Sequence, residues 1–365
     1  MKTLIVPLLF LFSPVVSSGS NPTPIAPVDS PLSPAPSGAD FLKRGGRDDI
    51  RIVAYNIWLN SVFDDPAASE RFRRVIRALD ADIWALQEVR EKPEAVAAFF
   101  NEAKPLPDGK SWEARYAGSK TTVSRYPIVL HHWRARHGCG NSFVGSDLID
   151  LPDQSYRCDL YVVNPSFSPF EGAERDADRQ CQADQVAAWL REARNPGGSV
   201  ELPPGTPIVL AGDFNMVGSL RPLTTLLEGD IVDEERFGPD SPPDWDGTGL
   251  ADPRPVHNGT GTDTWTWRSD RSRWQPGRLD FILYTNSVAH LSRAFVLNTV
   301  MMDDAALEAA GLERFDVVVR VLEDGGLVFD HLPVVADLHL EGTGNREDQA
   351  ETAVSQEKPP PSDLP

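Results

Sequence analysis

The sequence predicts an α/β fold in which two sheets pack face to face and helices cover their outer sides. Apolar strand patterns alternate with amphipathic helix patterns through the first part of the folded region, and late strands and loops then take over. Polar residues also follow directly on several of these strands. Their repeated position indicates a shared pocket at one rim of the paired sheets.

The first residues of the chain have the pattern of a secretory signal peptide. Within residues 1–18, Lys2 precedes an apolar run over residues 4–12, and the small residues Val16 and Ser18 follow. The run is too short to span a bilayer as a stable helix. We therefore expect an exported protein, secreted or periplasmic, with no transmembrane segment in the mature chain. An uncleaved membrane anchor is the alternative.

Composition divides the rest of the chain into three parts. Residues 19–45 are rich in Pro and Ser, and residues 342–365 are polar and acidic. Neither segment carries enough apolar residues to bury a core, so we expect a disordered spacer and a disordered tail. Residues 46–341 then form one folded domain, which we expect to be a monomer.

The formal net charge is −19 at pH 7. Non-specific nucleic-acid binding depends on Lys and Arg contacts with phosphates, and here the charge balance is reversed. We therefore expect no tight non-specific binding to DNA, although a local basic groove is compatible with this charge.

The three cysteines, Cys139, Cys158 and Cys181, match no metal-binding spacing. In an exported protein two of them can form a disulfide. We favour Cys139 with Cys158, and buried free thiols are an equal alternative.

Hydrophobic periodicity predicts the individual elements. Residues 67–80 place Phe72, Val75, Ile76 and Leu79 at i, i+3, i+4 and i+7, which is the pattern of a helix with one buried face. The same reasoning predicts further helices over 94–103 and 179–194, and strands over 50–57, 82–89, 121–128, 157–164, 207–215, 277–285 and 332–340.

The predicted strands end in groups that can do chemistry. Asp213 and Asn215 follow a buried strand at positions i and i+2, so their side chains point to the same side of an extended segment. An Asx turn is the alternative for that stretch alone. Asn56, Glu88 and Asp280 occupy equivalent places beside other strands, which favours a common pocket.

Metal binding and proton transfer both suit these residues. Glu88, Asp330 and Asn56 offer the hard oxygen ligands that Mg²⁺ prefers, with Asp213 as a further candidate ligand and with Mn²⁺ or Ca²⁺ as alternative metals. His331 follows Asp330 directly, and Asp280 could orient its imidazole. Asn215 can donate to a developing oxyanion. The set predicts metal-assisted attack of water on a phosphate ester.

Six motifs carry a family resemblance. "AYNIW", "LQEV", "VSRYPI", "LAGDFN", "GRLDFI" and "DHLPV" stand in this order within residues 48–341. The chain resembles the endonuclease/exonuclease/phosphatase superfamily, which includes deoxyribonucleases, AP endonucleases, sphingomyelinases and inositol polyphosphate 5-phosphatases. The resemblance implies a four-layer α/β/β/α sandwich with two packed mixed sheets, and Mg²⁺-dependent hydrolysis of a phosphodiester or phosphomonoester.

The resemblance also implies a role for each residue of the pocket. In chain order these are Asn56 and Glu88 beside the metal, Asp213 positioning the attacking water, Asn215 binding the phosphate, Asp280 partnering the histidine, and Asp330 with His331 as the last metal-side and catalytic pair.

One departure from the family pattern bears on activity. Ser166 occupies the position where many members carry a His or Tyr that donates a proton. A hydroxyl is a poor general acid, and losing such an acid typically costs about 10²–10⁴ in rate. Either the leaving group needs little protonation, or Tyr161 or His137 substitutes, or the protein binds phosphoesters without cleaving them. In each case Ser166 is predicted to contact the substrate.

Arg179 is the second predicted substrate contact, because the family often has Arg near the site at this point; a solvated helix face is the alternative. The substrate itself stays open among nucleic acids, lipid headgroups and sugar phosphates, since specificity depends on loops. We expect these loops at 131–157 and 229–263.

Overall fold

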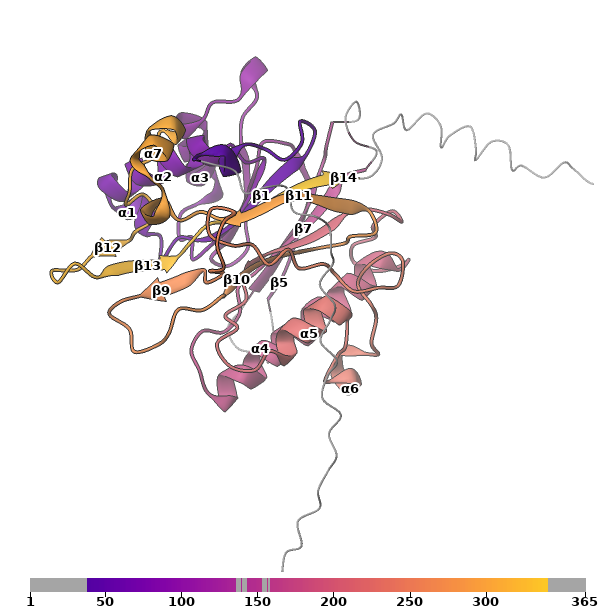
Figure 1. Cartoon of the computed structure of the whole chain (residues 1–365). Coiled ribbons are helices and arrows are strands. Elements are labelled where there is room, and N and C mark those ends of the chain that lie inside the picture. The colour runs from indigo at the N-terminus through magenta and orange to yellow at the C-terminus, as the bar shows by residue number, and fades with distance from the viewer. Residues whose placement is uncertain (1–37, 136–138, 140–142, 153–155, 157, 341–365) are drawn as a thin grey trace, which may run out of the picture. The chain divides into compact units, whose positions relative to one another are not determined.

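The computed structural model describes residues 38–135, 139, 143–152, 156 and 158–340 (Figure 1). The predicted signal peptide and acidic tail, most of the spacer and His137 lie outside the described residues. Across the described ranges, no helix combines the length and the apolar character needed to cross a bilayer.

Three sheets organise these residues. The first sheet has the strand order β11 (Ala289–Val296), β14 (Val334–Leu340), β1 (Ile50–Asn56), β2 (Ile83–Gln87), β4 (Lys120–Ser124), β3 (Glu113–Tyr116). The second has the order β10 (Asp280–Tyr284), β8 (Ile208–Asp213), β7 (Leu160–Pro165), β6 (Phe143–Ile149), β5 (Ile128–Ala135). A smaller third sheet has the order β12 (Arg320–Val321), β13 (Leu327–His331), β9 (Trp267–Ser269).

The helices complete the layers. They are α1 (Ser61–Asp64), α2 (Pro66–Leu79), α3 (Pro93–Ala103), α4 (Ala173–Arg194), α5 (Arg221–Glu228), α6 (Glu234–Phe237) and α7 (Asp304–Ala310). Short 3₁₀ turns occur at Asp40–Leu42, Pro107–Gly109 and Thr299–Met301.

The predicted four-layer sandwich is confirmed. The two large sheets are mixed: β1 and β2 are parallel, as are β7 and β8, and the other pairs are antiparallel. Their facing sides share one buried apolar cluster, which includes Ile52 from the first sheet and Val162 from the second. Figure 1 shows α2 and α3 on one side of the sheets and α4 and α5 on the other.

Helix α2 shows how the local sequence specifies a helix that its hydrophobic periodicity predicts. Asp65 caps its first turn by accepting a hydrogen bond from the N–H of Ala67, and Pro66 fits the first helical position. Phe72 and Leu79 lie on the predicted buried face. The helix ends at Asp80, which has a left-handed φ of 44°.

The prediction of a loop over 131–157 is wrong in part, because β5 and β6 occupy much of it. Asp147 is buried in this hairpin, with Oδ1 at 2.7 Å from His131 Nδ1. A buried polar pair interrupts the apolar alternation by which a strand is normally recognised. The other predicted loop, 229–263, contains one short helix, α6, and no strand of two or more residues.

The ordered domain starts before the predicted boundary at residue 46. Phe41 is 2% exposed and packs edge to face on Phe295, with ring centroids 5.1 Å apart. The N–H of Gly45 donates to Asp337 Oδ2 at 2.8 Å. The composition of residues 19–45 predicts a spacer up to residue 45. A single aromatic residue in such a polar segment can nevertheless attach its end to the core.

A buried ion pair lies between β1 and β14 in the first sheet. Arg51 and Asp337 face each other in the strand register, and two hydrogen bonds of 2.6 and 2.8 Å join their side chains. Arg51 Nη1 also donates to the carbonyls of Leu42 and Leu79. This guanidinium thereby joins the N-terminal segment and the end of α2 to the sheet.

Arg51→Ala is expected to lower the free energy of unfolding by about 3–5 kcal/mol, because Asp337 is left as a buried charge without its partner. Chemical denaturation measures the change. Arg77→Ala is the control, since Arg77 and its partner Glu70 are both about half exposed, and it should change stability by less than about 0.5 kcal/mol. Equal effects of the two substitutions would contradict this account.

Candidate active site

Strand directions bring the predicted pocket together. Because β1 and β2 are parallel, with Asn56 opposite Gln87, Asn56 and the following Glu88 emerge at the same edge. In the second sheet, β8 and β10 are antiparallel and Asp213 is paired with Asp280. With His331 at the end of β13 included, the structure thus places residues from five separate chain segments at one rim.

Amide groups surround Asp213. Asn56 Nδ2 donates to Asp213 Oδ2 and to Glu88 Oε1, both at 3.1 Å. Asn215 donates its backbone N–H to Asp213 Oδ1 at 3.0 Å and its Nδ2 to Oδ2 at 2.9 Å. The two asparagines therefore hold the carboxylate in one orientation.

A histidine–aspartate pair lies beside this carboxylate. His331 Nδ1 is 2.8 Å from Asp280 Oδ2, and His331 Nε2 is 3.9 Å from Asp213 Oδ2. Thr266 donates its hydroxyl to Asp280 Oδ2 at 2.6 Å and accepts the N–H groups of Leu279 and Asp280. The sequence analysis missed Thr266, because it precedes Asp280 by fourteen residues and no motif marks it.

Burial and charge set the protonation of the pair. Burial alone favours a neutral His331, but the charges of Asp280 and Asp213 outweigh it and raise the pKa of His331 from 6.5 to about 10. Burial raises the pKa of Asp213 to about 7, and the nearby Asp280 adds to this rise. Near neutral pH the histidine is therefore a charged donor, and Asp213 is close to the pKa suited to a general base.

Two further acids, Glu88 and Asp330, stand in the left-handed region of backbone space, with φ of 60° and 57°. Such strain in residues other than glycine gathers at functional sites. Burial raises the pKa of Asp330, and the negative charge of Glu88 raises it further. Mutual repulsion of these oxygens, together with the neutral oxygen of Asn56, fits a bound divalent cation.

Asp213, Asp280 and His331 form a second group whose ligand atoms lie within 4.8 Å of one another. A histidine must be neutral to bind a metal. His331 donates its Nδ1–H to Asp280 Oδ2, and its raised pKa favours a second proton on the ring, at Nε2, instead of a metal. We therefore place the metal with Asn56, Glu88 and Asp330, as a prediction.

Ser166 lies beside Asp213, and its predicted contact with substrate stays a prediction. It forms an isolated bridge with Asp213 and, with Glu88, lines a cavity of about 590 Å³. The next residue, Phe167, accepts a hydrogen bond from Asn215 Nδ2 at 3.0 Å. Tyr161 cannot replace the missing acid, because its side chain belongs to the core beneath α4 and its hydroxyl donates to Ser146.

Arg179 differs from both of its sequence interpretations. The residue is fully buried, and its Nη1 donates to the carbonyls of Ser168 and Phe170, both at 2.8 Å. It also pairs with Asp176. Arg179 therefore neither contacts substrate nor faces solvent; it holds the loop that follows Ser166.

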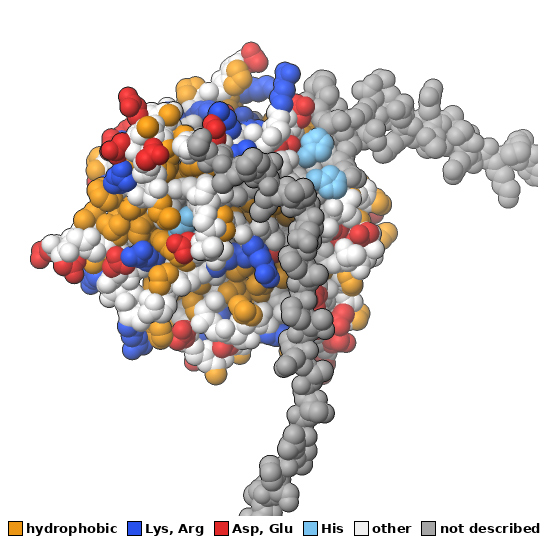
Figure 2. Space-filling model, viewed as in Figure 1, with side chains coloured by type: hydrophobic (Ala, Val, Ile, Leu, Met, Phe, Trp, Pro, Cys, Tyr) orange, Lys and Arg blue, Asp and Glu red, His pale blue; other side chains and the backbone are white. Residues whose placement is uncertain are grey.

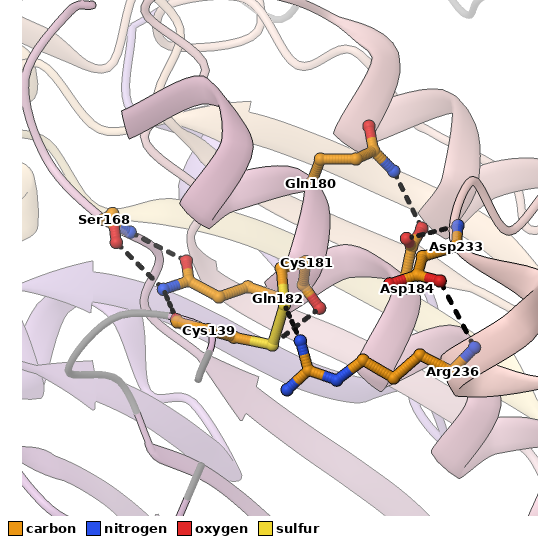
Figure 3. The surroundings of a disulfide bond; sticks show 8 residues. All are labelled: Cys139, Ser168, Gln180, Cys181, Gln182, Asp184, Asp233 and Arg236. Carbon is orange, nitrogen blue, oxygen red and sulfur yellow. Dashed lines mark hydrogen bonds between the residues drawn. A yellow bond between two sulfur atoms is a disulfide. The ribbon is translucent and has the colours of Figure 1, made fainter. Parts of the chain in front are cut away.

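The disulfide joins Cys139 to Cys181, so the favoured pairing with Cys158 is wrong. Spacing could not reveal that Cys139 lies against Cys181 of α4. Figure 3 shows Gln182 beside this bond: its Nε2 donates to the carbonyl of Cys139 and to Ser168 Oγ, and its Oε1 accepts the N–H of Ser168. Gln182 thus supports the same loop as Arg179, and the disulfide supports it indirectly by fixing Cys139, whose carbonyl Gln182 binds.

Comparisons with known proteins identify the family. Residues 53–300 match the model of the Endonuclease/Exonuclease/phosphatase family. No curated protein matches the chain.

Several solved structures have a similar chain trace. The human Nocturnin catalytic domain is 14% identical, with a TM-score of 0.48 over 81% of this chain and 96% of that one. Truncated TDP2 from Caenorhabditis elegans is 15% identical, with a TM-score of 0.47 over 80% and 97%. Sphingomyelinase C from Streptomyces griseocarneus is 16% identical, with a TM-score of 0.45 over 79% and 99%.

Asp280→Asn is expected to lower the pKa of His331, because it removes the nearest negative charge. The raised pKa means that the protonated ring stabilises the fold fully below pH 6.5, and this contribution is lost as the pH rises toward 10. The variant should lose it at lower pH. NMR of the imidazole nitrogens measures the titration directly.

Asp147→Asn is the matched control, because Asp147 faces His131 and not His331. It should leave the His331 titration in place. A His331 ring that titrates at the same pH in both variants and the wild type would contradict the assignment of Asp280.

Replacing Cys139 and Cys181 together by Ser is expected to cost about 4 kcal/mol of stability by the chain-entropy estimate for the 42-residue separation. Turnover should also fall, because the loop after Ser166 loses one of its supports. Denaturation and initial rates measure both effects. Cys158→Ala, which lies outside the disulfide, is the control and should change neither by a comparable amount.

Proposed function

This chain belongs to the endonuclease/exonuclease/phosphatase family, whose members hydrolyse phosphoesters, and we propose that it is an exported, divalent-metal-dependent phosphoesterase. One observation supports the proposal above the others. Asp213 is held by two asparagines and lies 3.9 Å from a histidine that is itself paired with Asp280. This arrangement joins a base for water with a charged donor for a phosphoryl group.

Each residue then has a definite task. Asp213 takes the proton of the attacking water, because its pKa of about 7 lets it hold or release a proton near neutral pH. His331, kept protonated by Asp280, donates a charged hydrogen bond to a phosphoryl oxygen. Asn215 donates to the charge that develops in the transition state by exchanging one of its two Nδ2 hydrogen bonds, which go to Asp213 Oδ2 and to the carbonyl of Phe167 in this structure.

Asn56, Glu88 and Asp330 would hold the metal. When bound, Mg²⁺ neutralises phosphate charge and polarises the ester; Mn²⁺ or Ca²⁺ could occupy the same oxygen ligands. Asn56 has the additional task of orienting Asp213 through its Nδ2. Loss of Asn56 therefore affects both the metal side and the base.

Ser166 supports a second candidate function. Its hydroxyl stands at the rim where a proton donor would assist departure of the leaving group, and no ionisable side chain is bonded to it among the described residues. A phosphoester-binding protein without hydrolysis is therefore the alternative. As an enzyme, the protein would favour leaving groups that are stable without protonation.

Export of the protein, its monomeric state and its preference for a small substrate are also proposals. The signal-peptide pattern of residues 1–18 indicates secretion or a periplasmic location, and the Cys139–Cys181 disulfide suits an oxidising compartment. On the face drawn in Figure 2, Lys and Arg side chains are scattered among Asp and Glu. That distribution, with the net charge of −19, favours a monomer acting on a nucleotide, lipid headgroup or sugar phosphate over tight binding to DNA.

Hydrolysis of bis(p-nitrophenyl) phosphate tests the activity, because its leaving group needs little protonation. We expect turnover that requires Mg²⁺ and stops with EDTA. Glu88→Gln and His331→Ala should each lower kcat/KM by about 10²–10⁴. His290→Ala, an exposed histidine on β11, is the control and should keep full activity. Full activity in the His331 variant would refute the proposal.

Ser166→His separates the enzyme from the binding protein. A large gain on esters with poor leaving groups, and little gain on the nitrophenyl ester, would show an enzyme that lacks its acid. If neither the wild type nor Ser166→His hydrolyses any ester, while calorimetry shows that both bind the metal, the binding function replaces the enzymatic one.

A further inference from the structure

A cavity of about 490 Å³ adjoins the metal side of the candidate site, and the proposed catalytic roles do not use it. It begins at Asn56 and lies between α1–α2 and residues 316–320. Apolar side chains such as Val62 and Val318 form part of its wall. The volume is suited to a small ligand and is too small for a nucleic-acid duplex.

The wall nearest the metal side is an unusual loop. Trp58, Leu59 and Asn60 all have left-handed φ, at 48°, 52° and 72°. Conformations of this kind persist only where the surroundings enforce them. Here Asn56 Oδ1 accepts the N–H of Trp58 at 3.0 Å, and Glu88 Oε2 accepts the N–H of Leu59 at 2.7 Å. The residues proposed to hold the metal therefore also shape this cavity.

The acids that line the cavity already have partners. Asp316 is bonded to Arg74, with its Oδ1 at 2.6 Å from Nη2. Asp64 accepts from Asn60 Nδ2 at 3.1 Å, and Asp65 caps α2. Of these three carboxylates only Asp316 is neutralised by a cation, whereas Asp64 and Asp65 accept from neutral donors and are exposed to solvent, which screens their charge.

Two arginines line the same cavity without such a partner. Arg71 and Arg320 form no ion pair within 4.0 Å with any residue of the described ranges. Arg320 stands over the ring of Trp58, at 5.9 Å from its centroid. In a chain of net charge −19, two guanidinium groups beside one aromatic ring offer a local site for an anion.

We propose that this cavity binds a second anionic group of the substrate, so that the preferred substrate is a compact phosphoester carrying another phosphate. Arg71 and Arg320 bind that phosphate through charged hydrogen bonds, and Trp58 packs on the ring that joins the two groups. An acyl chain suits the cavity less, because it would cover two guanidinium groups and leave their charge without a partner. The inference rests on the proposed function, since it names the substrate class of the same site.

Two nitrophenyl esters test the inference. They are the p-nitrophenyl ester of thymidine 5′-phosphate and the same ester with a 3′-phosphate. For the wild type we expect kcat/KM to be at least about tenfold higher on the 3′-phosphorylated ester, equivalent to about 1.4 kcal/mol. Arg71→Gln and Arg320→Gln should each bring this ratio toward one, mainly by raising KM for the bisphosphorylated ester.

Arg73→Gln is the matched control. Arg73 belongs to the same helix, but it pairs with Glu102 and stacks on Phe99 instead of lining the cavity. This variant should keep the wild-type ratio, which separates an effect of the cavity from a general change of charge on α2.

Calorimetric binding of thymidine 3′,5′-bisphosphate and thymidine 5′-phosphate gives a readout that needs no turnover. The bisphosphate should bind more tightly, and the difference should shrink in the Arg71 and Arg320 variants. Equal affinities in the wild type, or a ratio that neither variant changes, would overturn the inference. Faster hydrolysis of an ester with a long alkyl chain would show an apolar subsite and would also overturn it. Absence of hydrolysis with retained bisphosphate selectivity would refute the proposed function and leave the cavity assignment standing.

Discussion

Two carboxylates buried side by side are the constraint around which the candidate site is built. The antiparallel register of β8 and β10 places Asp213 directly opposite Asp280. Two negative charges on directly opposed residues of neighbouring strands, both removed from water, repel each other unless positive charge or hydrogen-bond donors compensate for them. His331 supplies the charge, and Thr266, Asn56 and Asn215 supply the donors. The same strand pairing that builds the sheet therefore dictates what must surround these acids.

A second set of contacts keeps the rim in place. The loop after Ser166 carries the carbonyl of Phe167, which orients Asn215, and the ring of Phe167 stacks on Phe214 in the core. Arg179 and Gln182 bind its backbone from α4, and the disulfide attaches the β5–β6 connection to the same helix. Helix α4 thus supports this loop through its buried Arg179 and Gln182.

Sequence reasoning reached the pocket because strand ends are marked by sharp changes from apolar to polar residues. Asn56, Asp213 and Asp280 stand at such changes, and the parallel or antiparallel pairing of their strands then brings them together. It failed where the information is spatial. In the sequence, Arg179 cannot be distinguished from a solvent-exposed charged residue of a helix, because nothing in the helix pattern shows that the loop after Ser166 buries it. The spacing of the cysteines does not show that Cys139 and Cys181 lie in contact. The polar His131–Asp147 pair also interrupts the apolar pattern by which β5 and β6 could have been recognised.

The packing of Phe41 and Gly45 on the first sheet limits how far a protease can trim the N-terminal end of the domain. A cut that removes residues before Asp40 leaves the ring of Phe295 covered and Asp337 with both of its partners. A cut beyond Gly45 bares an aromatic surface and takes one N–H donor from Asp337, a fully buried carboxylate on β14. Maturation by proteolysis would therefore have a natural stopping point, set by the stability of the product and independent of the sequence that the protease recognises.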